Sequence, residues 1–178
     1  MALSPTIFKF DVALADVDRH QYHQLNLTIA QHPSETSERM MARLLAYCLN
    51  VDEGLAFAGD LSASEAPDIW QLGLDNQILQ WIEVGEPSAE RLKKASRIAR
   101  QVLVYSFNSK SEHWWSRNGQ AITASKVSVY QFDWPQIKRL AGLAQRTLSL
   151  SISVSDQAAF IASESDSFEM TWRHLRDD

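Results

Sequence analysis

The stretch "APDIWQLGLDNQILQWIEVGEPSAERLKKASR", residues 66–97, carries the clearest structural pattern in the chain. It places a Pro-Asp pair before an apolar run that holds one glutamate, Glu83, and ends in a basic segment. The apolar residues on both sides of a polar turn near 74–77 predict two strands. Pro87 and Ser88 then mark the start of a helix. Because another apolar strand follows this helix, the order predicts a βαβ crossover and some parallel strand pairing.

The rest of the chain supplies strands and helices in an order that is typical of an α/β protein. Residues 7–16 and 25–30 alternate apolar and polar side chains around a polar turn, which predicts an N-terminal β-hairpin. We expect a single domain over residues 1–178, in which helices flank a mixed central sheet. The remaining expected elements are a helix at 32–50, two strands within 62–85, a helix at 88–101, a strand at 102–107, a short helix or loop at 111–119, a strand at 126–132, a helix at 133–146, and a C-terminal β-meander at 147–154, 158–162 and 168–172.

The composition limits the classes of protein to consider. Among the 178 residues, 45% are hydrophobic and 22% are charged, which is ordinary for a soluble globular protein. The net charge of -5 argues against a general nucleic-acid-coating protein but leaves room for a local basic groove. The one cysteine, Cys48, excludes an internal disulfide. Neither a signal peptide nor a run of about 18 apolar residues is evident, so we expect a cytoplasmic protein without a membrane segment.

Asp68 and Glu83 are the residues most suggestive of chemistry. Glu83 interrupts an apolar strand, where a carboxylate is costly unless it is paired or bound to a cation. Two carboxylates on neighbouring strands repel each other, and a divalent cation would relieve the repulsion. Mg²⁺ takes oxygen ligands at about 2.0–2.1 Å and often uses only one or two carboxylates. Such an ion, Mg²⁺ or Mn²⁺, can acidify water and stabilise charge that develops on a phosphodiester.

Three segments carry a resemblance to a known family. They are "HPSETSERMMARLLAY" at 32–47, "GLAFAGDLSASEAPDIW" at 54–70 and "WIEVGEPSAERLKKA" at 81–95. In this order, and with "LSLSISV" further along, the chain resembles the YaeQ family over nearly its whole length. The resemblance implies the restriction-endonuclease-like fold, which is also called PD-(D/E)XK.

The resemblance also implies a set of site residues. Its first acidic position is Glu38, which already stands out because it lies on the apolar stripe of the predicted 32–50 helix. The next positions are Asp68 and Glu83, and Val84 would add a backbone carbonyl as a metal ligand. The superfamily's lysine position holds Gly85 instead.

Lys94 is the candidate to replace that lysine, because superfamily members recruit a lysine from the following helix. At about 100° per residue, Lys94 lies nearer than Lys93 to the predicted apolar face, which includes Leu92, Ala95 and Ile98. We therefore expect the Lys94 ammonium within salt-bridge reach of Asp68 or Glu83. The predicted catalytic set is Glu38, Asp68, Glu83 and Lys94, and the predicted metal ligands are Asp68, Glu83 and Val84.

These residues leave two functions open, together with a third interpretation. The first is a Mg²⁺- or Mn²⁺-dependent phosphodiesterase, or nuclease, that acts on DNA or RNA. The second is a non-catalytic module that keeps the fold and binds nucleic acid or a protein partner, and Gly85 favours it. In the third the carboxylates are structural, and Glu38 pairs with Arg39, Arg43 or the helix dipole.

The basic run at 91–100 fits a phosphate groove or a solvated helix face. The tryptophans at 114–115 fit base stacking or core packing.

Overall fold

The structure is a computed structural model that describes residues 4–58 and 65–175. The chain divides into two compact units, and each combines segments that are far apart in the sequence. The prediction that residues 1–178 form one domain stays a prediction. The first unit contains Met1–Leu49 and Asp133–Trp172, and the second contains Asn50–Phe132 and Arg173–Asp178.

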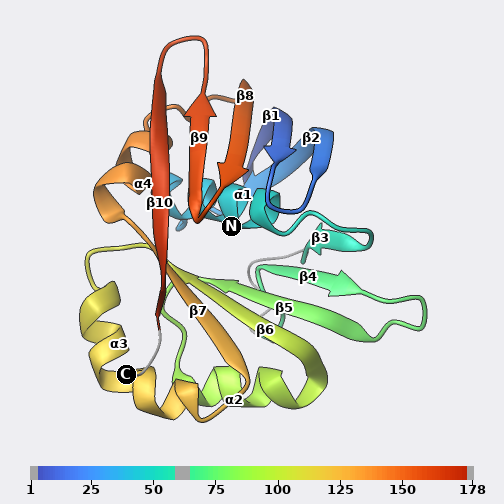
Figure 1. Cartoon of the computed structure of the whole chain (residues 1–178), viewed down its shortest axis with the longest axis vertical. Helices are drawn as coiled ribbons and strands as arrows, with labels where there is room; N and C mark the ends of the chain where they lie inside the picture. The colour runs from blue at the N-terminus through green and yellow to red at the C-terminus, as the bar shows by residue number, and fades with distance from the viewer. Residues whose placement is uncertain (1–3, 59–64, 176–178) are drawn as a thin grey trace. The chain divides into compact units, whose positions relative to one another are not determined.

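A mixed sheet forms the first unit (Figure 1). Strands β1 (Thr6–Asp16) and β2 (Gln21–Gln31) pair antiparallel, which confirms the N-terminal hairpin. β1 also pairs in parallel with β8 (Thr147–Ser155). The strands β8, β9 (Ala158–Ala162) and β10 (Ser167–Leu175) then follow one another antiparallel, which confirms the C-terminal meander.

Two helices belong to this unit and pack against each other. α1 (Ser37–Leu49) buries the apolar stripe that the sequence predicts, including Met41 and Leu44. α4 (Trp134–Ala141) starts after Asp133, whose carboxylate accepts a hydrogen bond from a backbone N–H of the first turn. α4 ends at Ala141 and is shorter than the predicted helix at 133–146.

The second unit holds the βαβ crossover that residues 66–97 predict. The elements of this unit are β3 (Leu55–Phe57), β4 (Ile69–Leu72), β5 (Ile78–Val84), α2 (Ala89–Ile98), β6 (Ala99–Ser106), α3 (Ser111–Thr123) and β7 (Val127–Phe132). β4 pairs antiparallel with β3 and β5, whereas β5, β6 and β7 are parallel. The part of the first predicted strand at 62–64 lies outside the described residues.

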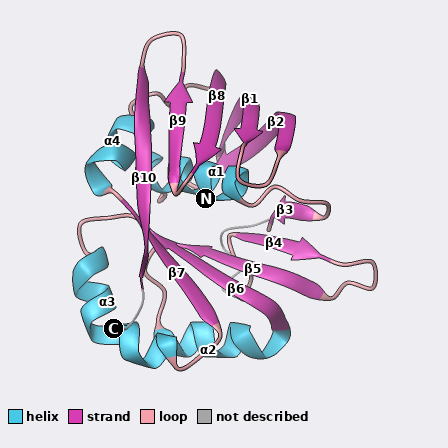
Figure 2. Cartoon of the chain, viewed as in Figure 1, coloured by secondary structure: helices cyan, strands magenta, loops and turns pink. Residues whose placement is uncertain are grey.

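Helices α2 and α3 lie along the same side of β5, β6 and β7 (Figure 2). Trp114 is 8% exposed, and its indole Nε1 donates to the backbone oxygen of Pro87 at 2.8 Å, so its role in this fold is core packing.

The parallel and antiparallel strand pairs, together with the helices, confirm the α/β class with mixed strand pairing. None of the helices in the described part of the chain is long and apolar enough to cross a membrane. The buried cluster between the helices and the sheet consists of Trp81, Leu92, Ala95, Val102, Val104, Trp114, Ile122 and Val129.

Candidate functional site

The antiparallel pairing of β4 and β5 brings Asp68 and Glu83 together. Ile69 stands opposite Ile82, and Asp68 comes one residue before β4. The backbone N–H of Asp68 donates to the Ile82 oxygen at 3.2 Å, which holds Asp68 beside β5. The charge of Asp68 acts on Glu83, so the two carboxylates lie near each other. Asp68 is 8% exposed and Glu83 is 7% exposed, so the predicted pair of carboxylates is present and buried.

Both carboxylates are held by hydrogen bonds. Asp68 Oδ2 accepts from the backbone N–H of Val84 at 2.7 Å. Glu83 Oε1 accepts from the indole Nε1 of Trp81 at 2.9 Å and from Arg91 Nε at 2.7 Å. Arg91 is one residue before Leu92, whose fully buried side chain fixes the first half of α2 on the sheet.

The environment of Glu83 perturbs its acidity. Burial raises the pKa of Glu83 above its usual 4.5, and the nearby charge of Asp68 adds to the increase. The indole of Trp81 and the guanidinium of Arg91 oppose the rise in pKa, because both favour the charged carboxylate. The folded protein therefore holds the Glu83 proton more tightly than the unfolded chain does.

This pKa gives a prediction for the variant Glu83→Gln. A carboxyl group with a raised folded-state pKa contributes stability below its unfolded pKa and loses it as pH rises through the folded value. The free energy of unfolding of the wild type should therefore fall relative to that of Glu83→Gln as pH rises above about 4.5. Each pKa unit of difference corresponds to about 1.4 kcal/mol.

Urea unfolding at a series of pH values would measure this difference. The exposed variant Glu90→Gln is the matched control, since its side chain is 81% exposed. A gap between wild type and Glu83→Gln that stays constant with pH, or that widens in favour of the wild type, would contradict the prediction.

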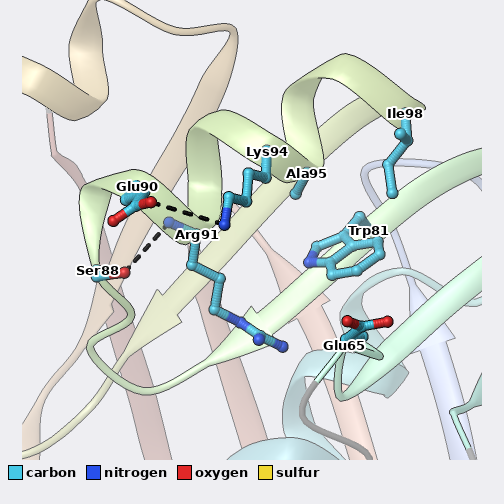
Figure 3. A pocket seen from close by; sticks show the side chains of 8 residues that line it. All are labelled: Glu65, Trp81, Ser88, Glu90, Arg91, Lys94, Ala95 and Ile98. Carbon is cyan, nitrogen blue, oxygen red and sulfur yellow. Dashed lines mark hydrogen bonds and ion pairs between the residues drawn. The ribbon is translucent and has the colours of Figure 1, made fainter.

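Lys94 does not make the predicted contact. Its Nζ lies 3.6 Å from Glu90 Oε1, and the Lys94 side chain is 73% exposed. Figure 3 shows the Lys94 side chain reaching Glu90 along the helix, while the Arg91 side chain runs from the helix toward the strands. Within the described residues, the cation that reaches Glu83 is Arg91. The geometric prediction for Lys94 is therefore wrong, and Lys93 is also exposed.

The error comes from the side chains that were compared, because only Lys93 and Lys94 were weighed against the apolar face of α2. The buried residues of the helix are Leu92 and Ala95, while Ile98 ends the helix and is 60% exposed. At 100° per residue, Arg91 lies about 70° from the mean direction of Leu92 and Ala95, and Lys94 lies about 130° away. Arg91 also lies nearer when Ile98 is included, so a projection that compared the arginine with the two lysines would have identified it.

Gly85, the residue at which the resemblance predicted a lysine, directly follows β5. Its φ is +128°, a conformation that L side chains rarely adopt, and its N–H donates to the Tyr105 oxygen at 2.9 Å. A Cβ at Gly85 would meet no atom within 4 Å. The backbone conformation, rather than a lack of space, therefore favours glycine here.

Glu38 lies in the first turn of α1 in the first unit, while the carboxylate pair belongs to the second. The expected pairing of Glu38 with Arg39 or Arg43 is wrong. Both guanidinium groups bind Glu35, at 2.5 Å for Arg39 and 2.6 Å for Arg43. Among the described residues Glu38 has no hydrogen bond or ion pair, and its place in the first turn favours the helix dipole. Its predicted catalytic role stays a prediction.

A cavity of about 440 Å³ lies next to the carboxylate pair (Figure 3). Trp81 and Arg91 line it and both donate hydrogen bonds to Glu83, so they separate this carboxylate from the cavity. Two acidic and two basic side chains balance the charge of its wall. The lining residues are Glu65, Trp81, Ser88, Glu90, Arg91, Lys94, Ala95 and Ile98.

The expected Mg²⁺ or Mn²⁺ ion does not fit the pair in this arrangement. A divalent ion needs carboxylate lone pairs directed at its own position, but Glu83 Oε1 already accepts two N–H donors. One of those donors belongs to Arg91, a fixed positive charge that would repel the ion. Within residues 4–58 and 65–175, no group of three or more His, Cys, Asp and Glu side chains could hold a metal ion. No observation tests the predicted metal ligands Asp68, Glu83 and Val84 directly, so they stay a prediction.

Mixed strand pairing, a βαβ crossover and two buried carboxylates beside a basic helix define the class of this chain as an α/β protein with a buried acidic pair. The chain belongs to the YaeQ protein family, which matches residues 1–172.

Relatives of similar length are known from several bacteria. The protein of Escherichia coli K12 named "Uncharacterized protein YaeQ" is 37% identical over 176 residues, covering 96% of this chain and 95% of its own. The protein of that name from Salmonella typhi is 38% identical over the same shares of the two chains. The crystal structure of YaeQ from Xanthomonas axonopodis pv. citri has a TM-score of 0.93 at 29% identity, covering 98% of this chain and 100% of its own. The crystal structure of YaeQ from Pseudomonas syringae has a TM-score of 0.92 at 34% sequence identity, covering 98% of this chain and 97% of its own.

Proposed function

We propose that this chain is a non-catalytic nucleic-acid-binding protein with a restriction-endonuclease-like fold, and that the outer side of α2 is its contact surface. The observation that carries the proposal is the state of two basic residues on α2. Lys93 and Arg97 are exposed and have no ion pair among the described residues. They are four positions apart and therefore neighbours on one side of the helix.

The neighbouring basic residues are engaged differently. Arg91 binds Glu83, Lys94 pairs with Glu90, and Arg100 donates to the Gln77 side chain at 3.1 Å. The segment 91–100 nevertheless holds five of the seventeen lysines and arginines in a chain of net charge -5. Such a local concentration of positive charge suits the phosphate backbone, which supplies most of the affinity in sequence-independent binding.

The carboxylate pair supports binding over hydrolysis. A metal-dependent phosphodiesterase would need an open cation position at Asp68 and Glu83, and the guanidinium of Arg91 already contacts Glu83. It would also need a lysine near the pair, but Lys94 is exposed beside Glu90. The buried pair on neighbouring strands is the observation that favours the phosphodiesterase, which is the second candidate.

Fluorescence anisotropy with labelled single- and double-stranded DNA and RNA at several salt concentrations tests the binding proposal. We expect affinity to fall steeply with salt in the wild type. In Lys93→Gln/Arg97→Gln, the slope of log Kobs against log salt should become less negative by about 1.4–1.8, because two phosphate contacts are lost.

The control is Lys9→Gln/Lys126→Gln, which removes the same charge from exposed positions outside α2. An equal effect of both double variants, or no binding of any probe at low salt, would overturn the proposal, and the latter result favours a protein partner. Incubation of the same probes with Mn²⁺ tests the second candidate function, the phosphodiesterase. Probe cleavage that is lost in the variant Asp68→Asn would establish this activity.

A further inference from the structure

Two buried carboxylates on neighbouring strands pose an electrostatic problem that the fold must solve. Asp68 and Glu83 are both less than 10% exposed, and the charge of Asp68 acts on Glu83. Each negative charge disfavours the other, and burial weakens the screening that water would provide. A cation beside the pair is therefore required if both groups are to remain ionised.

Arg91 supplies that cation with a fixed geometry. Its Nε donates to Glu83 Oε1 at 2.7 Å, and its terminal NH2 donates to the backbone oxygen of Ala66 at 2.8 Å. Ala66 lies two residues before Asp68, so one guanidinium links β5 to the chain that leads into β4. A planar group with five donors suits this bridging role better than the ammonium of a lysine.

The side chain is anchored at its base as well. Leu92, the next residue, is fully buried against the sheet, and Ser88 Oγ accepts a hydrogen bond from the Arg91 backbone N–H at 3.2 Å. The Arg91 side chain is 33% exposed and the Glu83 side chain is 9% exposed. The helix thus fixes the origin of the side chain, and the guanidinium closes the pair from the solvent side.

We propose that Arg91 is the built-in cation of the Asp68–Glu83 pair, in place of a divalent ion that the two carboxylates would otherwise attract. The wild-type chain then has no divalent-cation site at this pair. Removal of the guanidinium creates one, because the two carboxylates keep their positions before β4 and on β5 and lose their compensating charge. This inference concerns the pair alone and is independent of nucleic-acid binding by α2.

Calorimetric titration with Mn²⁺ of the wild type and of Arg91→Gln tests the proposal. We expect the variant to bind Mn²⁺ at least about tenfold more tightly than the wild type, a difference of about 1.4 kcal/mol. Arg91→Lys retains a positive charge, so its Mn²⁺ affinity should increase much less than that of Arg91→Gln. Adding Glu83→Gln to Arg91→Gln should abolish the gain.

A second readout locates the ion. The Trp81 indole N–H donates to Glu83, so paramagnetic Mn²⁺ at the pair should broaden its NMR resonance. Trp81→Phe identifies this resonance among the six tryptophans. We expect selective broadening in Arg91→Gln and none in the wild type at the same Mn²⁺ concentration.

Two results would overturn the proposal. One is saturable Mn²⁺ binding in the wild type that broadens the Trp81 resonance and that Glu83→Gln weakens. This result needs no variant at Arg91, so it decides even if Arg91→Gln fails to fold. The other is a folded Arg91→Gln variant, verified by circular dichroism, whose Mn²⁺ affinity equals that of the wild type.

Discussion

Leu92→Ala is expected to lower the free energy of unfolding by about 3–4 kcal/mol, because it leaves a cavity in a fully buried site. Leu92 belongs to the cluster between α2, α3 and the sheet, together with Trp81 and Ala95. Since the neighbouring residue is Arg91, the same substitution should loosen the contact between Arg91 and Glu83. Chemical denaturation monitored by circular dichroism would measure the change in stability.

Ile98→Ala is the matched control on the same helix. Its side chain is 60% exposed, so we expect a change below about 1 kcal/mol. Comparable losses for Leu92→Ala and Ile98→Ala would show that α2 packs through a different side from the one described. A loss below about 1 kcal/mol for Leu92→Ala would have the same meaning.

Glu86→Ala is expected to lower the free energy of unfolding by about 3 kcal/mol, because the Glu86 carboxylate accepts hydrogen bonds from several donors at the start of α3. Glu86 Oε1 accepts from Ser111 Oγ at 2.7 Å and from the Phe107 N–H at 3.2 Å, and Glu86 Oε2 accepts from Asn108 Nδ2 at 2.8 Å. Ser111 is fully buried and Phe107 is 5% exposed. Each buried donor that loses its acceptor costs about 1–3 kcal/mol.

Thermal and urea unfolding of Glu86→Ala, Glu86→Gln and Glu90→Ala would test this assignment. Glu86→Gln keeps one acceptor oxygen, so its free energy of unfolding should lie between those of the wild type and Glu86→Ala. Glu90 pairs only with exposed Lys94, so Glu90→Ala should change stability by less than about 1 kcal/mol. The assignment fails if Glu86→Ala is no more destabilising than Glu90→Ala.

The sequence pattern predicted most of the fold, because alternation and helix start signals are local. The hairpin at 7–30, the turn near 74–77 and the crossover through α2 follow from such signals and are confirmed. The helix boundaries were less certain. α2 ends at Ile98 and β6 starts at Ala99 with no connecting loop, so the last predicted helical residues belong to a strand. The parallel pairing of β5 with β6 supplied long-range hydrogen bonds that local propensity could not anticipate.

The candidate site was predicted in part. Asp68 and Glu83 could be paired from the sequence, because their strands are joined by a short turn that sets the register. The partner of the pair was missed because only lysines were compared on α2, whereas the helical projection already places Arg91 nearer than Lys94 to the buried side. The pairing of Glu35 with both Arg39 and Arg43 was also missed, since the two ion pairs form only once α1 and the segment before it are folded.

The conformation of Gly85 has a consequence for protein engineering. Restoring a lysine at the end of β5 is an obvious way to attempt to give this chain hydrolytic activity. The open space around Gly85 would admit the side chain, but its φ of +128° would add strain of about 1–3 kcal/mol with any other residue. A successful design would have to rebuild the exit of the strand together with the residue. Substituting lysine for Arg91 on α2 avoids that strain, because helical backbone accepts lysine readily, but it leaves a cation beside Glu83 that opposes a divalent ion.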